Sequence, residues 1–462
     1  MKTRYLLIFI SFLLAASINA EEKNIRKNFT VNQGQRVLVK GISNLQLKIT
    51  GWDKNEASIN VTARVNSSDS KFEKEYLKNF DVTYRTDAND IIIEFSETGK
   101  QGSWSVFDIF KGDFKYSFSK VITGEIMLPA SSPLAGEFNY SDLQISSIDE
   151  FINIGGKGNH LTFSSCAKLN EITNEYGDVN ARNCGGKINL NLKVAPLTIN
   201  DFTGSARIYS YGGSFNISRV NGSINISSYN SKGTIEDISS SVSSYSELSD
   251  ITMKKISGLL YINDKSGDLQ LFDIANVKVD GFRTELSAER ISAKDKVFFT
   301  TKYGNYKILN SSGAFYIDGD YSSYQITGTS GIFFYSASEG KFTGSSIKGD
   351  WQSDTKYSEI KLNGISASKI DVKGRGKNFT AVISNNPKKV EIGNTDADVS
   401  LTLNKEIRSS IFLTARHGEI NTEFPIPVSS EGSVKKGADR INGGGAVISI
   451  ETKNGDISIR RQ

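Results

Sequence analysis

A spacing of nine and eighteen residues runs through most of this 462-residue chain. Gly213 and Gly222 each open a Gly-x-apolar-x-apolar segment, nine residues apart, and Tyr303 and Tyr321 are eighteen residues apart. Self-similarity at a fixed step is typical of a chain built from one repeated structural unit. We therefore expect the polypeptide to coil on itself, with one unit following another along an axis.

Each unit contains five or six residues in which apolar and polar side chains alternate, bounded by Gly, Asn, Ser or Asp. Alternation with a period of two indicates a half-buried strand, and Gly and Asn provide the backbone conformations that sharp corners need. Helical spacing is almost absent. It occurs at 71–80, where Phe72, Tyr76 and Phe80 recur every four residues, and it predicts one or two helical turns at the surface.

Short strands with tight corners could form antiparallel hairpins or a parallel β-solenoid. A hairpin sandwich would vary its loops and strand lengths, whereas constant spacing favours coils stacked about 4.8 Å apart. The chain has only 6 prolines, which fits strands whose N–H groups are needed for the ladder. The predicted fold is an all-β, single-stranded β-helix or solenoid of short stacked strands, with atypical terminal coils. The recurring tyrosines are then expected to stack on one another.

Four segments are expected along the chain. Residues 1–20 resemble a signal peptide, because Lys2 and Arg4 precede an apolar run that ends near Ala20. Residues 21–130 are predicted to form an N-terminal β region with inserted loops, supplying the solenoid cap and the first coils. Residues 131–415 hold the regular repeats, and residues 416–462 form a C-terminal loop and closing strands. Terminal units differ because they must cover an exposed sheet edge.

Charge and hydropathy limit the compartment and the partners. Without the predicted signal the net charge falls from +4 to +2, which does not fit the basic face of a nucleic-acid-binding protein. No later segment approaches the ~18 apolar residues of a membrane-spanning helix. We expect an exported protein with no transmembrane segment after signal cleavage, in the periplasm, on the outer-membrane surface or outside the cell. The oligomeric state stays open.

Three motifs, in this order, carry a resemblance to a known family: Ile49-Thr50-Gly51-Trp52-Asp53, Gly124-Glu125-Ile126-Met127-Leu128-Pro129 and Ile441-Asn442-Gly443-Gly444-Gly445-Ala446. The chain is similar to bacterial exported β-strand-repeat proteins of unknown function, labelled putative adhesins, including those of Bacteroidetes-type organisms. The resemblance spans the chain that follows the signal. It implies a β-solenoid in the cell envelope, and it brings no catalytic residues.

The two cysteines test the length of the coil. Cys166 and Cys184 are eighteen residues apart, so a solenoid would place them at equivalent positions on adjacent coils. Their Cα atoms would then be about 5 Å apart, which is within the range of a disulfide. Export permits oxidation. The sequence leaves two states open, a disulfide or a ladder of packed thiols.

Candidate catalytic and metal-binding residues are few. A hydrolytic triad or a zinc site would have to use His160 or His417, and neither lies in a recognisable motif. Calcium could use the carboxylates of Asp318 and Asp320, although corner aspartates are common in repeat proteins. We expect no catalytic residue, no cofactor and no metal site.

Carbohydrate chemistry is the main alternative. Some β-helices are polysaccharide lyases or hydrolases, but the candidates here, Asp264, Lys265 and Asp268, show no diagnostic arrangement. Aromatic rings can stack on sugars, and Trp52, Trp104 and Trp351 are the candidate surface platforms. The competing interpretation is that Trp52 caps the solenoid edge and that tyrosines form internal ladders.

The sequence therefore predicts a non-catalytic scaffold that is adhesin-like or binds components of the cell envelope. Its expected partners are surface glycans or envelope proteins. The alternatives are a carbohydrate-active β-helix, a glycan-binding module, and a sensor or regulatory partner in the envelope.

Overall fold

The computed structural model describes residues 21–87, 89–97 and 118–462. The predicted signal peptide at 1–20 and the candidate platform Trp104 therefore lie outside the described residues. Two compact units divide the chain, residues 1–207 (unit 1) and 208–462 (unit 2). Among the described residues, no helix is long and apolar enough to cross a membrane.

Unit 1 consists of short strands and one described helix. The helix is α2 (Ser70–Asn79), as the Phe72, Tyr76 and Phe80 spacing predicted, and the side chain of Asp69 caps it by accepting a hydrogen bond from the Lys71 N–H. The strands are β1 (Glu21–Thr30), β2 (Arg36–Lys40), β3 (Leu45–Trp52), β4 (Glu56–Ser67), β5 (Phe80–Asp87), β6 (Asp90–Glu97), β7 (Phe118–Pro129), β8 (Leu134–Asn139), β9 (Asp142–Ser146), β10 (Phe151–Lys157), β11 (His160–Ser164), β12 (Lys168–Glu175), β13 (Asp178–Lys193) and β14 (Leu197–Tyr211), which runs past the end of the unit.

Two pairing patterns meet in unit 1. From β8 to β11 each strand pairs in parallel with the strand two places later, as β8 does with β10 and β9 with β11, and β12 pairs in parallel with the long strand β13. Nearer the N-terminus, β4 lies antiparallel to both β1 and β7, and β5 lies antiparallel to β6. Strand β3 joins the patterns, because it pairs in parallel with β7 on one side and β9 on the other.

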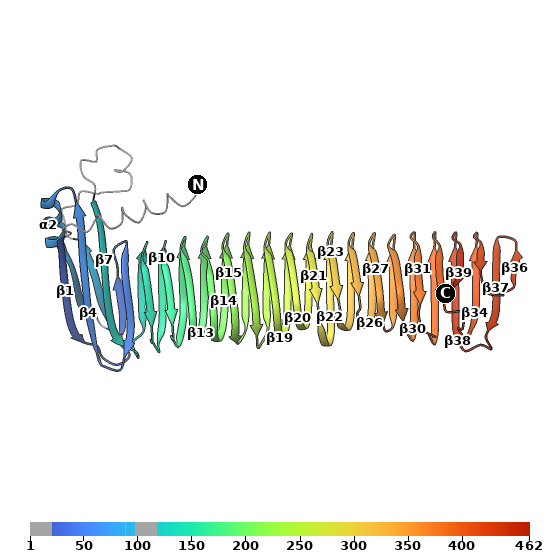
Figure 1. Cartoon of the computed structure of the whole chain (residues 1–462), viewed down its shortest axis with the longest axis horizontal. Coiled ribbons are helices and arrows are strands. Elements are labelled where there is room, and N and C mark those ends of the chain that lie inside the picture. Colours follow the sequence, from blue (N-terminus) through green and yellow to red (C-terminus); the bar gives the residue numbers. More distant parts are fainter. Residues whose placement is uncertain (1–20, 88, 98–117) are drawn as a thin grey trace, which may run out of the picture. The chain divides into compact units, whose positions relative to one another are not determined.

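Unit 2 repeats the parallel pattern throughout most of its length, and its strands stand side by side from green to red in Figure 1. They are β15 (Ser214–Asn221), β16 (Ile224–Tyr229), β17 (Lys232–Ile238), β18 (Val242–Glu247), β19 (Asp250–Lys265), β20 (Asp268–Phe282), β21 (Glu285–Glu289), β22 (Ser292–Lys302), β23 (Asn305–Leu309), β24 (Ser312–Asp320), β25 (Ser323–Thr327), β26 (Ser330–Ser338), β27 (Lys341–Lys348), β28 (Trp351–Lys356), β29 (Glu359–Ser366), β30 (Lys369–Arg375), β31 (Phe379–Ile383), β32 (Lys389–Thr395), β33 (Val399–Leu403), β34 (Ser409–Arg416), β35 (Ile420–Thr422), β36 (Val428–Glu431), β37 (Val434–Ile441), β38 (Ala446–Lys453) and β39 (Ile457–Arg461). The all-β solenoid predicted from the sequence is confirmed.

The corners between strands explain the recurring tyrosine followed by a small residue. Tyr303 and Tyr321 adopt the left-handed conformation, with φ of 61° and 51°, and their rings stack at 5.1 Å. Each backbone N–H donates to a carbonyl of the next coil, that of Tyr303 to Asp320 at 3.1 Å and that of Tyr321 to Ser338 at 2.9 Å. These bonds offset the ~1 kcal/mol that a left-handed residue costs.

The small residue after the tyrosine points inward. Ser322 is buried, and its hydroxyl donates to the Asp320 carbonyl at 2.7 Å and accepts from the Gly304 N–H at 3.2 Å. The same left-handed corner recurs in unit 2 at Gly212, Asn230, Leu248, Ser266, Arg283, Glu339, Tyr357, Gly376 and Asp396.

Inside unit 2, each coil contributes one residue to a column of identical or similar side chains. Phe315 stacks on Phe333 with ring centroids 5.1 Å apart, and Phe333 stacks on Trp351 at 6.0 Å. Trp351 is only 1 % exposed. Burial of apolar side chains, these aromatic rings among them, is the main favourable term in this core.

A column of glycines lets neighbouring coils of unit 2 approach each other closely. Gly313, Gly331 and Gly349 are eighteen residues apart, with φ of 150°, 134° and 135°. A Cβ atom on Gly331 would lie 1.8 Å from the carbonyl oxygen of Gly313. No other residue type fits this position without displacing the backbone.

We predict that Gly331→Ala lowers the free energy of unfolding by at least about 2 kcal/mol, because the methyl group would force two coils apart. The matched control is Gly393→Ala, where an added Cβ meets no atom within 4 Å. The control should change the free energy of unfolding by less than about 1 kcal/mol. Urea unfolding followed by circular dichroism measures both, and equal effects would contradict the glycine ladder.

Candidate functional site

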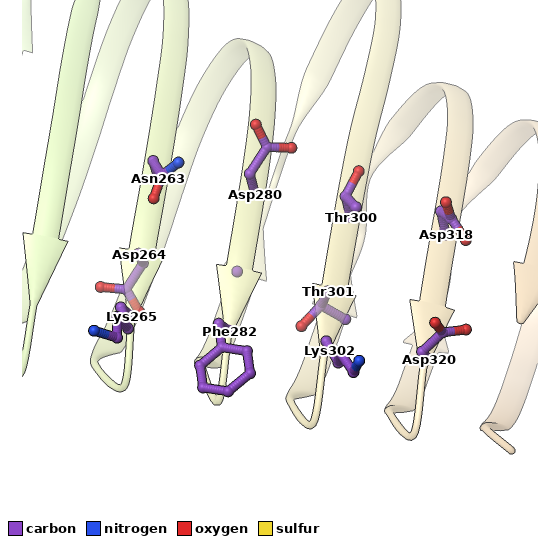
Figure 2. A pocket seen from close by; sticks show the side chains of 11 residues that line it. Asn263, Asp264, Lys265, Asp280, Phe282, Thr300, Thr301, Lys302, Asp318 and Asp320 are labelled. Carbon is purple, nitrogen blue, oxygen red and sulfur yellow. The ribbon is translucent and has the colours of Figure 1, made fainter. Parts of the chain in front are cut away.

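A hollow with charges of both signs lies on the outer side of unit 2 and is the candidate site (Figure 2). Its volume is about 430 Å³. We call it the mixed-charge hollow. It is lined by Asn263, Asp264, Lys265, Asp280, Gly281, Phe282, Thr300, Thr301, Lys302, Asp318 and Asp320.

The lining residues come from four neighbouring parallel strands, β19, β20, β22 and β24. Strand register aligns them in rows across the coils. One outer row contains Asn263, Asp280, Thr300 and Asp318, which pair directly in sequence, and Figure 2 shows one of these side chains on each strand. The row beside the corner contains Lys265, Phe282, Lys302 and Asp320. Backbone pairing alone therefore brings these groups together.

The inner side of the hollow holds a buried carboxylate. Asp264 is 1 % exposed, and it accepts hydrogen bonds from the Ser246 and Thr284 hydroxyls and, at 3.1 Å, from the Gly267 N–H. Burial raises the pKa of Asp264 above its ordinary value, and these hydrogen bonds oppose that rise. Both side-chain oxygen atoms of Asp264 accept hydrogen bonds from neighbouring residues. Asp264 therefore stabilises the corner of the coil between β19 and β20.

The outer carboxylates have different surroundings. Asp280 pairs with Lys278 on its own strand at 3.3 Å. Burial, followed by the charge of Asp320, raises the pKa of Asp318. Asp318 is thus an exposed carboxyl group whose pKa is raised above its ordinary value.

Two buried hydroxyl groups beside the hollow lack hydrogen bonds. Thr301 lines the hollow and is 3 % exposed, and Tyr306 is 2 % exposed. The two hydroxyls are neighbours, but their geometry falls short of a hydrogen bond, and neither has another partner among the described residues. An unsatisfied buried hydroxyl typically costs about 1–3 kcal/mol. Burial raises the pKa of Tyr306 above its ordinary value.

The fold places the residues that the sequence suggested for carbohydrate chemistry in two different hollows. Asp264 and Lys265 line the mixed-charge hollow, together with the calcium candidates Asp318 and Asp320. Asp268 instead lines a second hollow of about 480 Å³, on β20, β21, β23 and β25. Among the described residues, no group of three or more His, Cys, Asp or Glu side chains is placed to hold a metal ion.

The expected aromatic platforms are placed differently from one another. Trp351 lies in the core, so its expected role at the surface is wrong, because it continues the inward column of Phe315 and Phe333. Trp52 is half-buried at the end of β3, where its indole N–H donates to the Glu56 carbonyl at 2.8 Å and the Lys54 ammonium lies 4.6 Å from the ring centroid.

The two histidines lie at coil boundaries, outside the hollow. His160 is exposed and is hydrogen-bonded to Asp178 on the next coil. His417 occupies a left-handed corner with φ of 58°. Neither contacts a serine or cysteine nucleophile through any hydrogen bond of its ring in the described chain.

The two cysteines are buried and lie on adjacent coils, where the Gly185 N–H donates to the Cys166 carbonyl at 2.8 Å. Both are free thiols in this structure. Hydrogen bonding to Cys184 and burial raise the pKa of Cys166 above its ordinary value. Cys166 is therefore a poor nucleophile, but the pair is close enough for oxidation to be tested.

We predict a disulfide between Cys166 and Cys184 in protein recovered from an oxidising compartment, because the shared column position brings the two thiols together. The untreated protein should then be lighter by two hydrogen atoms than the reduced protein. Intact mass spectrometry with and without reductant measures this. Identical masses would assign the pair as packed thiols, and Cys184→Ser provides the control that cannot form the bridge.

We predict a pH dependence for Asp264→Asn, which removes the ionisable group and keeps its shape. Because the folded-state pKa of Asp264 is raised, its ionised form lowers the free energy of unfolding at neutral pH, and protonation removes this cost. As pH falls from neutral toward about 4, the free energy of unfolding of the wild type should rise relative to that of the variant. The rise is about 1.4 kcal/mol for each tenfold difference in proton affinity between the folded and unfolded states. Urea unfolding at several pH values measures it, and parallel pH curves would contradict it.

Comparisons with known proteins return solved structures that are named putative adhesins or putative cell adhesion proteins. A putative cell adhesion protein from Clostridium sporogenes aligns over 96% of this chain and 100% of its own, with 10% identity and a TM-score of 0.16. A putative adhesin from Parabacteroides merdae aligns over 62% of this chain and 96% of its own, with 12% identity and a TM-score of 0.25. A putative adhesin from Bacteroides fragilis aligns over 63% of this chain and 99% of its own, with 10% identity and a TM-score of 0.20.

No family model matches the chain, and no curated protein matches it significantly. The names of the similar structures carry the label of the family that the sequence resembles.

Proposed function

We propose that this chain is an exported, non-catalytic scaffold of the cell envelope that binds surface components in the manner of an adhesin. The observation that carries the proposal is the outer row of polar side chains that strand pairing aligns in unit 2. It continues beyond the hollow through Ser336 and Asp354, each paired with its neighbour on the next coil. A coil interior filled by apolar columns leaves these outer rows available to a partner, together with exposed corner tyrosines such as Tyr303 and Tyr321.

The charge pattern of the outer rows favours a broad binding surface. Ion pairs also join neighbouring coils of unit 1, where Glu175 pairs with Lys157 at 3.0 Å and Lys193 at 2.6 Å. Hydrogen bonds from Lys193 and Lys157 hold the pKa of Glu175 at about 2. The outer row of unit 2 carries the carboxylates of Asp280, Asp318 and Asp354, and the row beside the corner carries the ammonium groups of Lys265 and Lys302, so the two rows together present both signs of charge. This supports contacts with neutral or mixed-charge surfaces.

A carbohydrate-active enzyme is the second candidate function, because Asp318 combines a raised pKa with nearby carboxylates at Asp320 and Asp280. Glycoside hydrolysis typically uses two carboxyl groups with different pKa values. Incubation with acidic and neutral glycans, followed by detection of new reducing ends, separates the two functions. Turnover of any glycan would replace the scaffold proposal with an enzymatic one.

We predict that deleting the gene lowers attachment of the producing cells to a host-cell or glycan-coated surface. Expression of the full chain should restore attachment, whereas a chain that lacks residues 1–20 should not, because it would stay inside the cell. Adherent cells are counted after washing, and surface exposure is followed by protease treatment of intact cells. Unchanged attachment after deletion would overturn the adhesin-like role.

A further inference from the structure

We infer that residues 446–462 form a removable coil, held in a slot of unit 2 that can close without them. We call this segment, which consists of β38 and β39, the inserted coil. It lies between the coil of β32 and β33 and the coil of β34 and β35, which we call the two wall coils. The slot is therefore a binding site for a segment of the chain itself. This inference is independent of the proposed function.

The inserted coil departs from the order in which the regular coils stack. In the regular repeats of unit 2, neighbouring coils follow one another in the sequence, as β30 and β32 do, and β31 and β33. The inserted coil comes after β34 and β35 in the sequence, yet it separates them from β32 and β33. The two wall coils are thus consecutive along the chain but are held apart by a later segment.

The two wall coils match each other in register. Val447 of the inserted coil pairs with Lys389 on one wall and with Ser410 on the other, and these two residues are twenty-one positions apart. Val399 and Ile420 also share one partner in the inserted coil, and they are twenty-one positions apart as well. In register, β30 and β32 are separated by a similar step of twenty. Without the inserted coil, the wall coils would therefore meet as ordinary neighbours.

The inward side chains of the wall coils also fit such a pairing. Direct stacking would place Val390 beside Ile411 and Ile392 beside Leu413. All four side chains are buried in the present structure. A register error of one residue would turn such side chains outward, whereas this pairing keeps them all in the core.

The corners can be bonded in both arrangements. Asp396 and His417, on the two wall coils, are left-handed with φ of 60° and 58°, and Asn454 lies between them with φ of 55°. The Asp396 N–H donates to the Lys453 carbonyl at 2.7 Å, and the Asn454 N–H donates to the Arg416 carbonyl at 2.8 Å. In a closed slot, the Asp396 N–H would donate to the Arg416 carbonyl directly. The corner ladder is then complete with or without the inserted coil.

The connections allow both arrangements. Residues 404–408, between β33 and β34, are as many as residues 384–388, which join β31 to β32 on the directly neighbouring coil. The first connection is therefore long enough for a closed slot. The inserted coil is joined to β37 by residues 442–445, which include three glycines. Glycine accepts many backbone conformations, and these residues have no large side chain to withdraw from the core.

The closed slot is a minor state. Four inward isoleucines of the inserted coil are no more than 1 % exposed: Ile448, Ile450, Ile457 and Ile459. Their burial favours insertion. Expulsion loses the contacts of the inserted coil with both walls but regains contacts between the walls themselves. It is therefore a rearrangement of the folded chain between two states, and not the unfolding of this part of unit 2.

A cysteine pair in the full chain tests whether the slot closes. Glu391 and Phe412 lie on the two walls and both pair with Ser449. Two coil steps, about 9.6 Å, therefore separate them now, and one step of about 4.8 Å would separate them in a closed slot. Only the shorter separation lies within the Cα range of a disulfide, about 4.4–6.8 Å. We expect Glu391→Cys with Phe412→Cys to cross-link under a mild oxidant as the inserted coil leaves.

Two control pairs share Glu391→Cys and the same outer row. Ser449→Cys lies on the adjacent coil and should cross-link fastest. Gln352→Cys lies two coils away, with Asp371 between them on a coil that cannot leave, because it lies between the other two in the sequence. The pair that includes Phe412→Cys should cross-link at least about tenfold faster than the pair that includes Gln352→Cys. Peptide mapping identifies each disulfide and distinguishes it from one between the native cysteines.

Trypsin then reports the position of the inserted coil. In the protein cross-linked between the two walls, trypsin should cut after Lys453, because the expelled backbone is no longer held in the ladder. The reduced protein should resist that cut. Equal rates for the pairs with Phe412→Cys and Gln352→Cys would overturn the inference. So would a cross-linked protein in which Lys453 stays protected.

Hydrogen exchange of the unmodified full chain gives a second test that needs no substitution. Fraying from the exposed edge at β36 predicts that amides of β34 exchange faster than those of β38, which lies deeper in the stack. A removable coil predicts the opposite order, because β34 regains a partner when the slot closes. We expect β38 and β39 to exchange faster than both wall coils. Slower exchange of β38 than of β34 would overturn the inference.

Discussion

The fold depends on the backbone hydrogen bonds that join each coil to the next. Parallel strands set the coils about 4.8 Å apart, and the bonds continue around the corners through left-handed residues such as Tyr303 and Tyr321. Because both strands and corners are bonded in this way, each side chain lies directly beside its equivalent on the neighbouring coils. Columns of like residues in the core and rows of mixed charge on the surface follow from this one constraint.

The repeat could be predicted from the sequence because most coils of the regular region have the same length. An eighteen-residue step correctly predicted the stacked pairs Tyr303–Tyr321 and Tyr211–Tyr229, whose ring centroids are 5.1 and 5.2 Å apart. The helix at Ser70–Asn79 followed from the spacing of its aromatic residues. These features depend on local pattern, which a single sequence contains.

The candidate site could not be assembled from the sequence because the coils around it have unequal lengths. Asn263 pairs with Asp280 seventeen residues later, and Asp280 pairs with Thr300 after twenty. Register shifts in β19 and β22 absorb the difference, so a fixed step of eighteen misaligns the row. Asp264, Lys265 and Asp318 were visible as charged residues, but only the pairing register brings them to one hollow.

Two further features escaped sequence reasoning for different physical reasons. Trp351 was expected at the surface because tryptophan is large and often serves as a binding platform, yet the column of Phe315 and Phe333 provides it with an aromatic neighbour inside. Corners were expected to need Gly or Asn. Tyr, Leu and Arg also occupy left-handed positions, because the coil-to-coil hydrogen bond compensates for their strain.

The C-terminal end of unit 2 shows how the same ladder closes the stack. Strands β38 and β39 are the last in sequence, yet β38 lies between β32 and β34, and β39 lies between β33 and β35. The coil that contains β34 and β35 is thus joined to the coil of β32 and β33 through β38 and β39, which lie between them. Beyond it, β37 and β36 add antiparallel strands, so the edge on that side is the four-residue, fully exposed β36. A short polar edge strand discourages pairing with another chain. Strands β36 to β39 therefore complete the stack of coils and supply its exposed edge. Removal of β38 and β39 would expose the edges of β32 and β33, which are longer strands than β36, unless another strand paired with them.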